Sequence, residues 1–198
     1  MIENISKIIC DFALQYSMLY DHKNEDIYRY GIEITISSLL GVIVILFLGA
    51  ITKDLQSAIL FLLSFIGLRS YCGGYHANSY MKCNSIFVIS YIVVYWVAQI
   101  AYMFKWKSEM MIISGIATVI ISIFAPVTNA NKPLDLYDIK KSKIISIVLA
   151  MILLAYSLLK IYKNEYLGYL ISMTLALVAV MMIRTFMGGE KNGFEKNN

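Results

Sequence analysis

Long stretches without any charged residue constrain this chain more than any other feature. Residues 34–52, 83–104, 110–131 and 166–183 contain no Asp, Glu, Lys or Arg. As a helix, an uncharged apolar stretch of about 18 residues or more can cross a hydrocarbon core roughly 30 Å thick. We therefore predict membrane-spanning helices at these four positions. Because 59% of the residues are hydrophobic and only 15% are charged, the chain lacks the polar surface that a soluble globule of this size needs.

Two shorter uncharged stretches add to this count. Residues 144–159 lie between Lys143 and Lys160, whose long side chains can reach the membrane surface, so we predict a further full span there. Residues 55–68 amount to only about 21 Å of helix at a rise of 1.5 Å per residue. This length fits either a short span or a re-entrant segment. The predicted total is six transmembrane helices, of which the second is either a short span or a re-entrant segment.

The N-terminal region has a different pattern. Residues 1–20 contain Glu3, Lys7 and Asp11 and no continuous apolar centre, so we expect no cleavable signal peptide. The apolar residues recur at steps of three and four: Ile2, Ile5, Ile9, Phe12, Tyr16 and Leu19. That spacing is typical of an amphipathic helix lying on a membrane surface. The predicted fold class is therefore all-α, a polytopic membrane protein of six transmembrane helices plus an N-terminal amphipathic interfacial helix, in a single domain over residues 1–198.

Basic residues are divided unequally between the two sides of this six-span arrangement. Twelve fall on one side: Lys7, Lys23, Arg29, Arg69, Lys82, Lys132, Lys140, Lys141, Lys143, Arg184, Lys191 and Lys196. The other side has Lys53, Lys105, Lys107, Lys160 and Lys163. Cytoplasmic loops carry the excess of Lys and Arg. We predict a multi-pass protein of the cell membrane with both termini in the cytoplasm. Cys10, Cys72 and Cys83 lie on the same side, where thiols stay reduced, so we expect no disulfide.

The connection between the second and third predicted spans is rich in reactive side chains. From Arg69 to Cys83 it reads Arg-Ser-Tyr-Cys-Gly-Gly-Tyr-His-Ala-Asn-Ser-Tyr-Met-Lys-Cys. A thiol becomes a nucleophile as its thiolate, which a neighbouring imidazole favours, and His76 is the histidine placed to do so. We predict Cys83 as a catalytic nucleophile and His76 as its base, at the cytoplasmic side of the membrane.

The seven-residue spacing of this pair requires a bend in the backbone. In one unbroken helix the two residues would lie about 10.5 Å apart along the axis, too far for direct proton transfer. Asn78 and Ser79 favour turns and helix caps, so we predict a break there, with Cys83 opening the third span. The N-terminus of that helix would then stabilise a thiolate at Cys83 through its free N–H groups and its dipole.

Several residues of the loop have more than one structural or functional interpretation. Gly73 and Gly74 can adopt positive φ, either as a flexible hinge or as an oxyanion hole. Taken singly, His76 also reads as an interfacial histidine and Cys83 as a small apolar residue at a helix start. The sequence selects no third member of a triad, since five side chains could orient His76: Asn78, Asn84, Ser85, Asn129 and Asn131.

Two rival functions are consistent with parts of the pattern. A metal site of Cys72, His76 and Cys83 lacks a fourth ligand and the His-Glu-x-x-His motif of intramembrane metalloproteases. A non-catalytic peptide exporter or membrane binding protein would also have six spans. However, coupled transporters keep acids or histidines at mid-membrane depth, and the four long spans contain none. We expect no metal, no other cofactor and no nucleic-acid partner.

The loop motifs resemble those of the accessory gene regulator protein B (AgrB) family, membrane peptidases of Gram-positive quorum sensing. Arg69, Gly73-Gly74, the Tyr-His-Ala around His76 and Cys83 match the family pattern at its usual intervals. The segment Phe-Ala-Pro-Val-Thr-Asn-Ala-Asn-Lys-Pro-Leu at 124–134 resembles a second family signature, the loop after the fourth span. With the hydropathy profile, the resemblance extends over almost the whole chain.

The resemblance implies that the substrate is an AgrD-like propeptide. Cys83 would cleave off its C-terminal tail through an acyl-enzyme, and a cysteine or serine of the precursor would then close a thiolactone or lactone ring. Arg69 matches a functionally important position and would stabilise the loop or bind substrate. Family membership further implies a homodimer. The cluster of Lys132, Lys140, Lys141 and Lys143 would attract an acidic precursor tail, although ordinary positive-inside bias explains it equally well.

Overall fold

The computed structural model describes residues 25–73, 80–127 and 136–194, and the regular structure in these ranges is helical. The helices are α2 (Glu25–Ile51), α3 (Leu55–Cys72), α4 (Tyr80–Met103), α5 (Lys107–Phe124), α6 (Leu136–Tyr162) and α7 (Tyr166–Phe194). The all-α prediction is confirmed. The predicted N-terminal amphipathic helix lies outside the described residues.

Five of these helices are long and apolar enough to cross a membrane. The apolar windows are residues 55–72, 83–103, 107–124, 137–162 and 166–187. The protein is therefore a multi-pass membrane protein, as predicted. Which side faces the cytoplasm stays a prediction from the charge distribution.

The first two predicted spans compare differently with the helices in the structure. The doubtful segment 55–68 belongs to α3, a single continuous helix of 18 residues that runs on through Arg69 to Cys72. The structure thus agrees with the short span and not with a re-entrant segment. The predicted span 34–52 corresponds to the apolar part of α2, residues 35–51, which is shorter than the other five windows.

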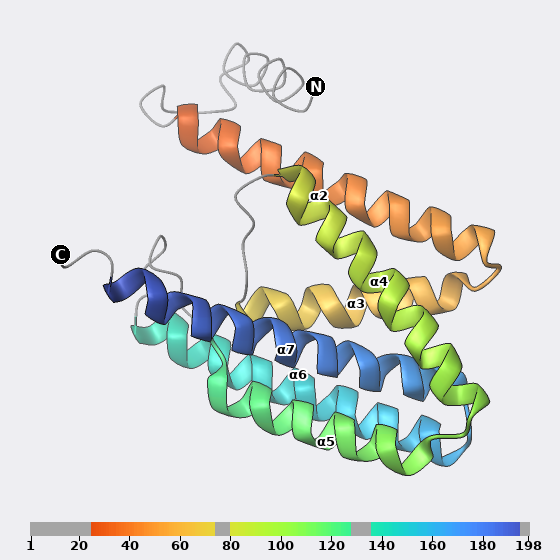
Figure 1. Cartoon of the computed structure of the whole chain (residues 1–198). Coiled ribbons are helices and arrows are strands. Elements are labelled where there is room, and N and C mark those ends of the chain that lie inside the picture. The colour runs from red at the N-terminus through yellow and green to blue at the C-terminus, as the bar shows by residue number, and fades with distance from the viewer. Residues whose placement is uncertain (1–24, 74–79, 128–135, 195–198) are drawn as a thin grey trace.

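The helices run back and forth between two ends of the bundle (Figure 1). α7 is the central helix, packed against α3, α4, α5 and α6, and its inward side chains include the fully buried Tyr169, Leu175 and Met182. α2 packs mainly on α3 and α4 and lies at the edge of the bundle. α3 and α4 follow one another in sequence but touch over only a short stretch, because each packs mainly on its other neighbours.

Three tight turns close one end, which we call the turn end. They connect α2 to α3, α4 to α5 and α6 to α7, and each contains a non-glycine residue with positive φ: Lys53 (55°), Lys105 (55°) and Asn164 (56°). In the first turn, Asp54 N–H donates to the carbonyl of Gly49 and Lys53 N–H to that of Ala50; the other two turns repeat these bonds. This pair of bonds is the Schellman motif, which satisfies the last carbonyls of a helix.

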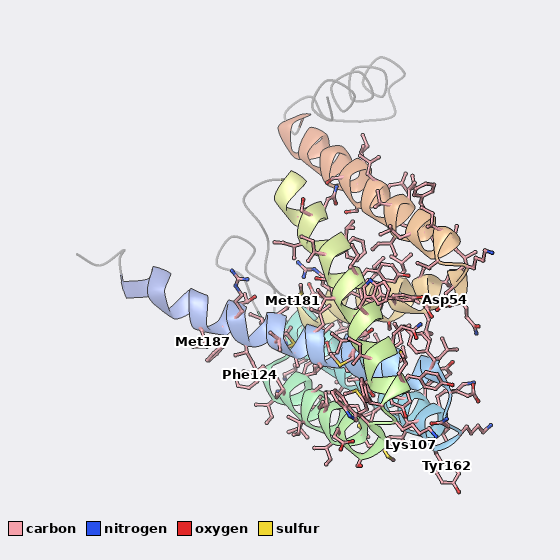
Figure 2. The ribbon with its side chains drawn as sticks, turned by 45° about the vertical axis from the view of Figure 1, so that its right-hand side comes forward. Asp54, Lys107, Phe124, Tyr162, Met181 and Met187 are labelled. Carbon is pink, nitrogen blue, oxygen red and sulfur yellow. The ribbon has the colours of Figure 1, made fainter. Side chains whose placement is uncertain are left out.

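The opposite end, which we call the pocket end, holds the end of α3, the start of α4, the end of α5, the start of α6 and the end of α7. In Figure 2, Asp54, Lys107 and Tyr162 mark the turn end, and Phe124 and Met187 lie toward the pocket end. The lysines at 53, 105, 107, 160 and 163 are all at the turn end. The described basic residues are therefore sorted between the two ends as the sequence predicted.

α5 differs from the uncharged stretch 110–131 at both ends. It begins at Lys107 and ends at Phe124, where the family resemblance places the loop after the fourth span. A proline disfavours helical geometry in the residue before it, and Ala125, which precedes Pro126, is extended (φ −75°, ψ 144°). The early start is favoured by Glu109 in the first turn, where the helix dipole stabilises a negative charge.

Buried polar residues in the described part of the chain are all serine or threonine. Several hydroxyls donate to the carbonyl four residues earlier, as in Ser64 to Leu60 (2.6 Å) and Thr118 to Ser114 (2.8 Å). Others join helices: Ser157 and Ser172 Oγ atoms are 2.7 Å apart across the α6 and α7 contact. Small hydroxyl residues that satisfy themselves within or between helices are typical of packing inside a membrane.

Candidate functional site

A pocket of about 380 Å³ lies between α2, α3, α4 and α7 toward the pocket end. Its lining is mostly apolar: Ser38, Val42, Phe65, Ile66, Arg69, Ser70, Gly73, Cys83, Asn84, Ile86, Phe87 and Met181. Three residues singled out from the sequence, Arg69, Gly73 and Cys83, share this one lining. The gap that forms it exists because α3 and α4 diverge here and are bridged by α2 on one side and α7 on the other.

Cys83 lies in the first turn of α4, half-buried and not in a disulfide. α3 ends at Cys72 and α4 begins at Tyr80, and the helix break predicted at Asn78 and Ser79 lies outside the described residues. The first turn of a helix has free backbone N–H groups and the positive end of the helix dipole.

Arg69 lies one turn before the end of α3 and faces the same pocket. Its Nη1 donates to the Met181 sulfur at 3.6 Å, and its guanidinium carbon is 5.8 Å from the centroid of the Phe65 ring. Arg69 from α3 and Cys83 from α4 therefore line the same pocket.

Gly73 ends α3 with a left-handed backbone, φ 72°. It forms a parallel bridge with Val127, whose N–H donates to the carbonyl of Cys72 at 2.9 Å. A Cβ atom on Gly73 would overlap the carbonyl oxygen of Val127. Glycine is therefore required here twice, for its φ and for the close backbone approach. The bridge fixes Gly73 beside Val127 in this structure, and the choice between hinge and oxyanion hole for the glycine pair stays a prediction.

Several predicted residues lie outside the described residues or outside the pocket. Gly74, His76 and Lys132 are not among the described residues, nor are Asn78, Asn129 and Asn131. Lys140 and Lys141 are exposed on the first part of α6, at the pocket end but not in the pocket lining. Their substrate role stays a prediction.

Cys72 and Asn84 differ in their position relative to the pocket. Cys72 is fully buried and does not line the pocket. Asn84 lines the pocket, and its Nδ2 donates to Ser37 Oγ on α2 at 3.0 Å. This bond ties the start of α4 to α2 directly beside Cys83.

Sequence reasoning missed the contributions of Ser38, Val42 and Met181, because hydropathy gives no information on which distant helices meet. The phenylalanines could have been found. Phe65 precedes Arg69 by four residues and Phe87 follows Cys83 by four, so each shares a helix face with a reactive side chain.

Comparisons with known proteins converge on one family. The model of the family "Accessory gene regulator B" matches residues 5–187. A putative AgrB-like protein 2 of Clostridium perfringens is 31% identical over 71% of this chain and 68% of its own length. Accessory gene regulator protein B of Staphylococcus haemolyticus is 26% identical over 83% of this chain and 85% of its own, and that of Staphylococcus saprophyticus 23% identical over 96% and 99%. No solved structure matches the chain.

Proposed function

Because this chain belongs to the accessory gene regulator B family of agr quorum sensing, we propose that it is a membrane-embedded cysteine endopeptidase that processes an AgrD-like propeptide. One observation carries the proposal. Cys83, in the first turn of α4, and Arg69, near the end of α3, face one pocket that is large enough for a substrate residue.

The reaction begins with attack of the Cys83 sulfur on a carbonyl carbon of the bound precursor. His76 accepts the thiol proton and passes it to the leaving amine, so the peptide bond breaks and the C-terminal tail departs. A thioester between Cys83 and the N-terminal part of the precursor remains. The guanidinium of Arg69, which belongs to the same pocket lining, would stabilise the developing oxyanion.

Ring closure follows by transfer of the acyl group within the bound precursor. A cysteine or serine side chain of the precursor attacks the thioester, a thiolactone or lactone forms, and the Cys83 sulfur recovers its proton from the attacking group through His76. A mostly apolar pocket favours this transfer over hydrolysis because it excludes water. Lys132, Lys140 and Lys141 would attract an acidic tail near the same end of the bundle, and the enzyme would act as a homodimer.

The test is co-expression of the chain with an AgrD-like precursor, followed by mass spectrometry of both proteins. We expect a shortened, cyclised peptide and a covalent adduct on Cys83. The matched control is Cys72→Ala, which removes the other thiol of this region without changing the pocket lining. Cleavage of the precursor by Cys83→Ala membranes would refute the proposal, and release of uncleaved precursor outside the cell would support the exporter instead.

A further inference from the structure

We propose that Phe65 and Phe87 form the floor of a specificity pocket that binds the side chain of the substrate residue whose carbonyl Cys83 attacks, and that this residue is large and apolar. The inference rests on the proposed peptidase function and adds to it the substrate class and the residues that select it.

The floor lies one helical turn deeper than the reactive groups. Phe87 follows Cys83 by four residues on α4, and Phe65 precedes Arg69 by four on α3, so each ring lies about 5.4 Å further along the same helix face. The two rings stack on each other across the gap, with centroids 5.3 Å apart and planes 27° from parallel. Both belong to the lining that contains Cys83.

Beneath this floor the space between α3 and α4 is filled. Phe61 stacks against Phe65 with centroids 5.3 Å apart and lies 5.2 Å from the ring of Tyr91. Phe61 is fully buried and Tyr91 is only 2% exposed. The pocket therefore ends at Phe65 and Phe87, and a side chain that enters beside Cys83 contacts these rings.

The size and polarity of the pocket define its occupant. A volume of about 380 Å³ is near the lower end of the range of roughly 300–1,000 Å³ for small-ligand sites, so it suits one side chain with its flanking backbone. The apolar lining also includes Val42, Ile66 and Ile86. The cation of the lining, Arg69, lies at the level of Cys83, one turn above the floor. A charged side chain on the floor would lose its hydration without a partner there.

The first experiment varies the substrate. Membranes containing the wild-type chain process an AgrD-like precursor, the cleavage site is mapped by mass spectrometry, and the residue before it is replaced by Leu, Phe, Ala, Gln or Asp. We expect kcat/KM for Leu or Phe to exceed that for Ala by about 10- to 200-fold, as a few buried methylenes allow, with Asp lowest. Equal rates for Leu and Ala, or a preference for Asp, would overturn the inference.

The second experiment changes the floor. Phe87→Ala deepens the pocket, so the ratio of rates for a Trp precursor to a Leu precursor should rise about 10-fold or more. Phe61→Ala is the matched control, because it removes a ring from the same cluster without lining the pocket. A rate ratio measured on one membrane preparation is independent of how much enzyme folds. Should Phe87→Ala yield no folded protein, Phe87→Leu gives a smaller shift in the same direction. An unchanged ratio would contradict the floor assignment.

Membranes containing the Cys83→Ala variant, assayed in parallel, distinguish a failure of the proposed function from a failure of the specificity pocket. If these membranes still cleave the precursor, the proposed function fails. If cleavage requires Cys83 but ignores both the substrate residue and Phe87, the peptidase stands and only the specificity pocket is wrong.

Discussion

The two ends of this bundle solve the problem of ending a helix in different ways. At the turn end, three helices finish in the same Schellman motif, and each next helix starts after a three-residue turn. At the pocket end, α3 finishes at Gly73, and the carbonyl of Cys72 accepts its hydrogen bond from Val127, far away in sequence. A helix that caps itself locally needs no partner, whereas a helix capped by a distant loop couples that loop to its own last turn. The pocket that Arg69 and Cys83 line lies at the end where the distant residue Val127 caps α3.

The difference predicts that substitutions at the pocket end change catalysis and that those at the turn end change only stability. The largest effect belongs to Cys83→Ala, which removes the nucleophile. We expect precursor cleavage to fall by roughly 10⁴-fold or more, as for other covalent catalysts. Cleavage rates from intact-mass analysis measure it, with Cys72→Ala expected to retain most activity. Near-normal precursor cleavage by the Cys83→Ala protein would contradict the prediction that substitutions at the pocket end change catalysis.

Gly73→Ala should break the distant cap. The added Cβ overlaps the Val127 carbonyl oxygen and forces a non-glycine residue into φ 72°, at a cost of about 3 kcal/mol in folding free energy. Thermal unfolding in detergent should move to lower temperature, and precursor cleavage should fall as the end of α3 shifts. Gly67→Ala, in the same helix with open space around it, is the control. We expect it to be neutral or slightly stabilising; equal melting temperatures for the two variants would contradict this account.

Arg69→Lys keeps a positive charge at the pocket but removes the planar guanidinium. Lysine cannot reproduce the geometry by which Arg69 contacts Met181 and the Phe65 ring while facing Cys83. We expect the cleavage rate to fall by about 10- to 100-fold, with little change in melting temperature. Steady-state kinetics on the variant membranes measure the first quantity. A large loss of stability with unchanged activity would instead assign Arg69 to the fold.

Lys105→Gly should give the smallest effect and the opposite sign. Lys105 occupies a left-handed conformation at φ 55°, which costs a non-glycine residue roughly 1 kcal/mol and costs glycine almost nothing. We expect a slightly raised melting temperature and an unchanged cleavage rate, measured on the same preparation. Lys107→Gly serves as the control, since Lys107 begins α5 and glycine inside a helix is unfavourable. A change in cleavage rate at Lys105 would show that the turn end is coupled to the pocket.

Much of the fold follows from the sequence because the bilayer thickness converts local hydropathy into helix positions. The uncharged stretches locate the helices, and the described lysines lie at the end that the charge distribution predicts. The turn-forming pair Asn78 and Ser79 precedes the start of α4 in the sequence. The absence of charge over 110–131 does not locate the end of α5, because it says nothing about the local effect of Pro126 on Ala125. The doubtful second span was settled only by the continuous helix through Arg69, which length alone did not decide.

The sequence by itself determined an all-helical membrane protein and the residue types of its reactive loop, because helix formation in lipid and thiol chemistry depend on neighbours in the chain. Only the tertiary structure decided that α3 and α4 diverge, that α2 and α7 close the gap with Val42 and Met181, and that Gly73 lies against Val127. These contacts join segments far apart in sequence, and they depend on how whole helix faces pack together. No pattern within a single segment records that packing.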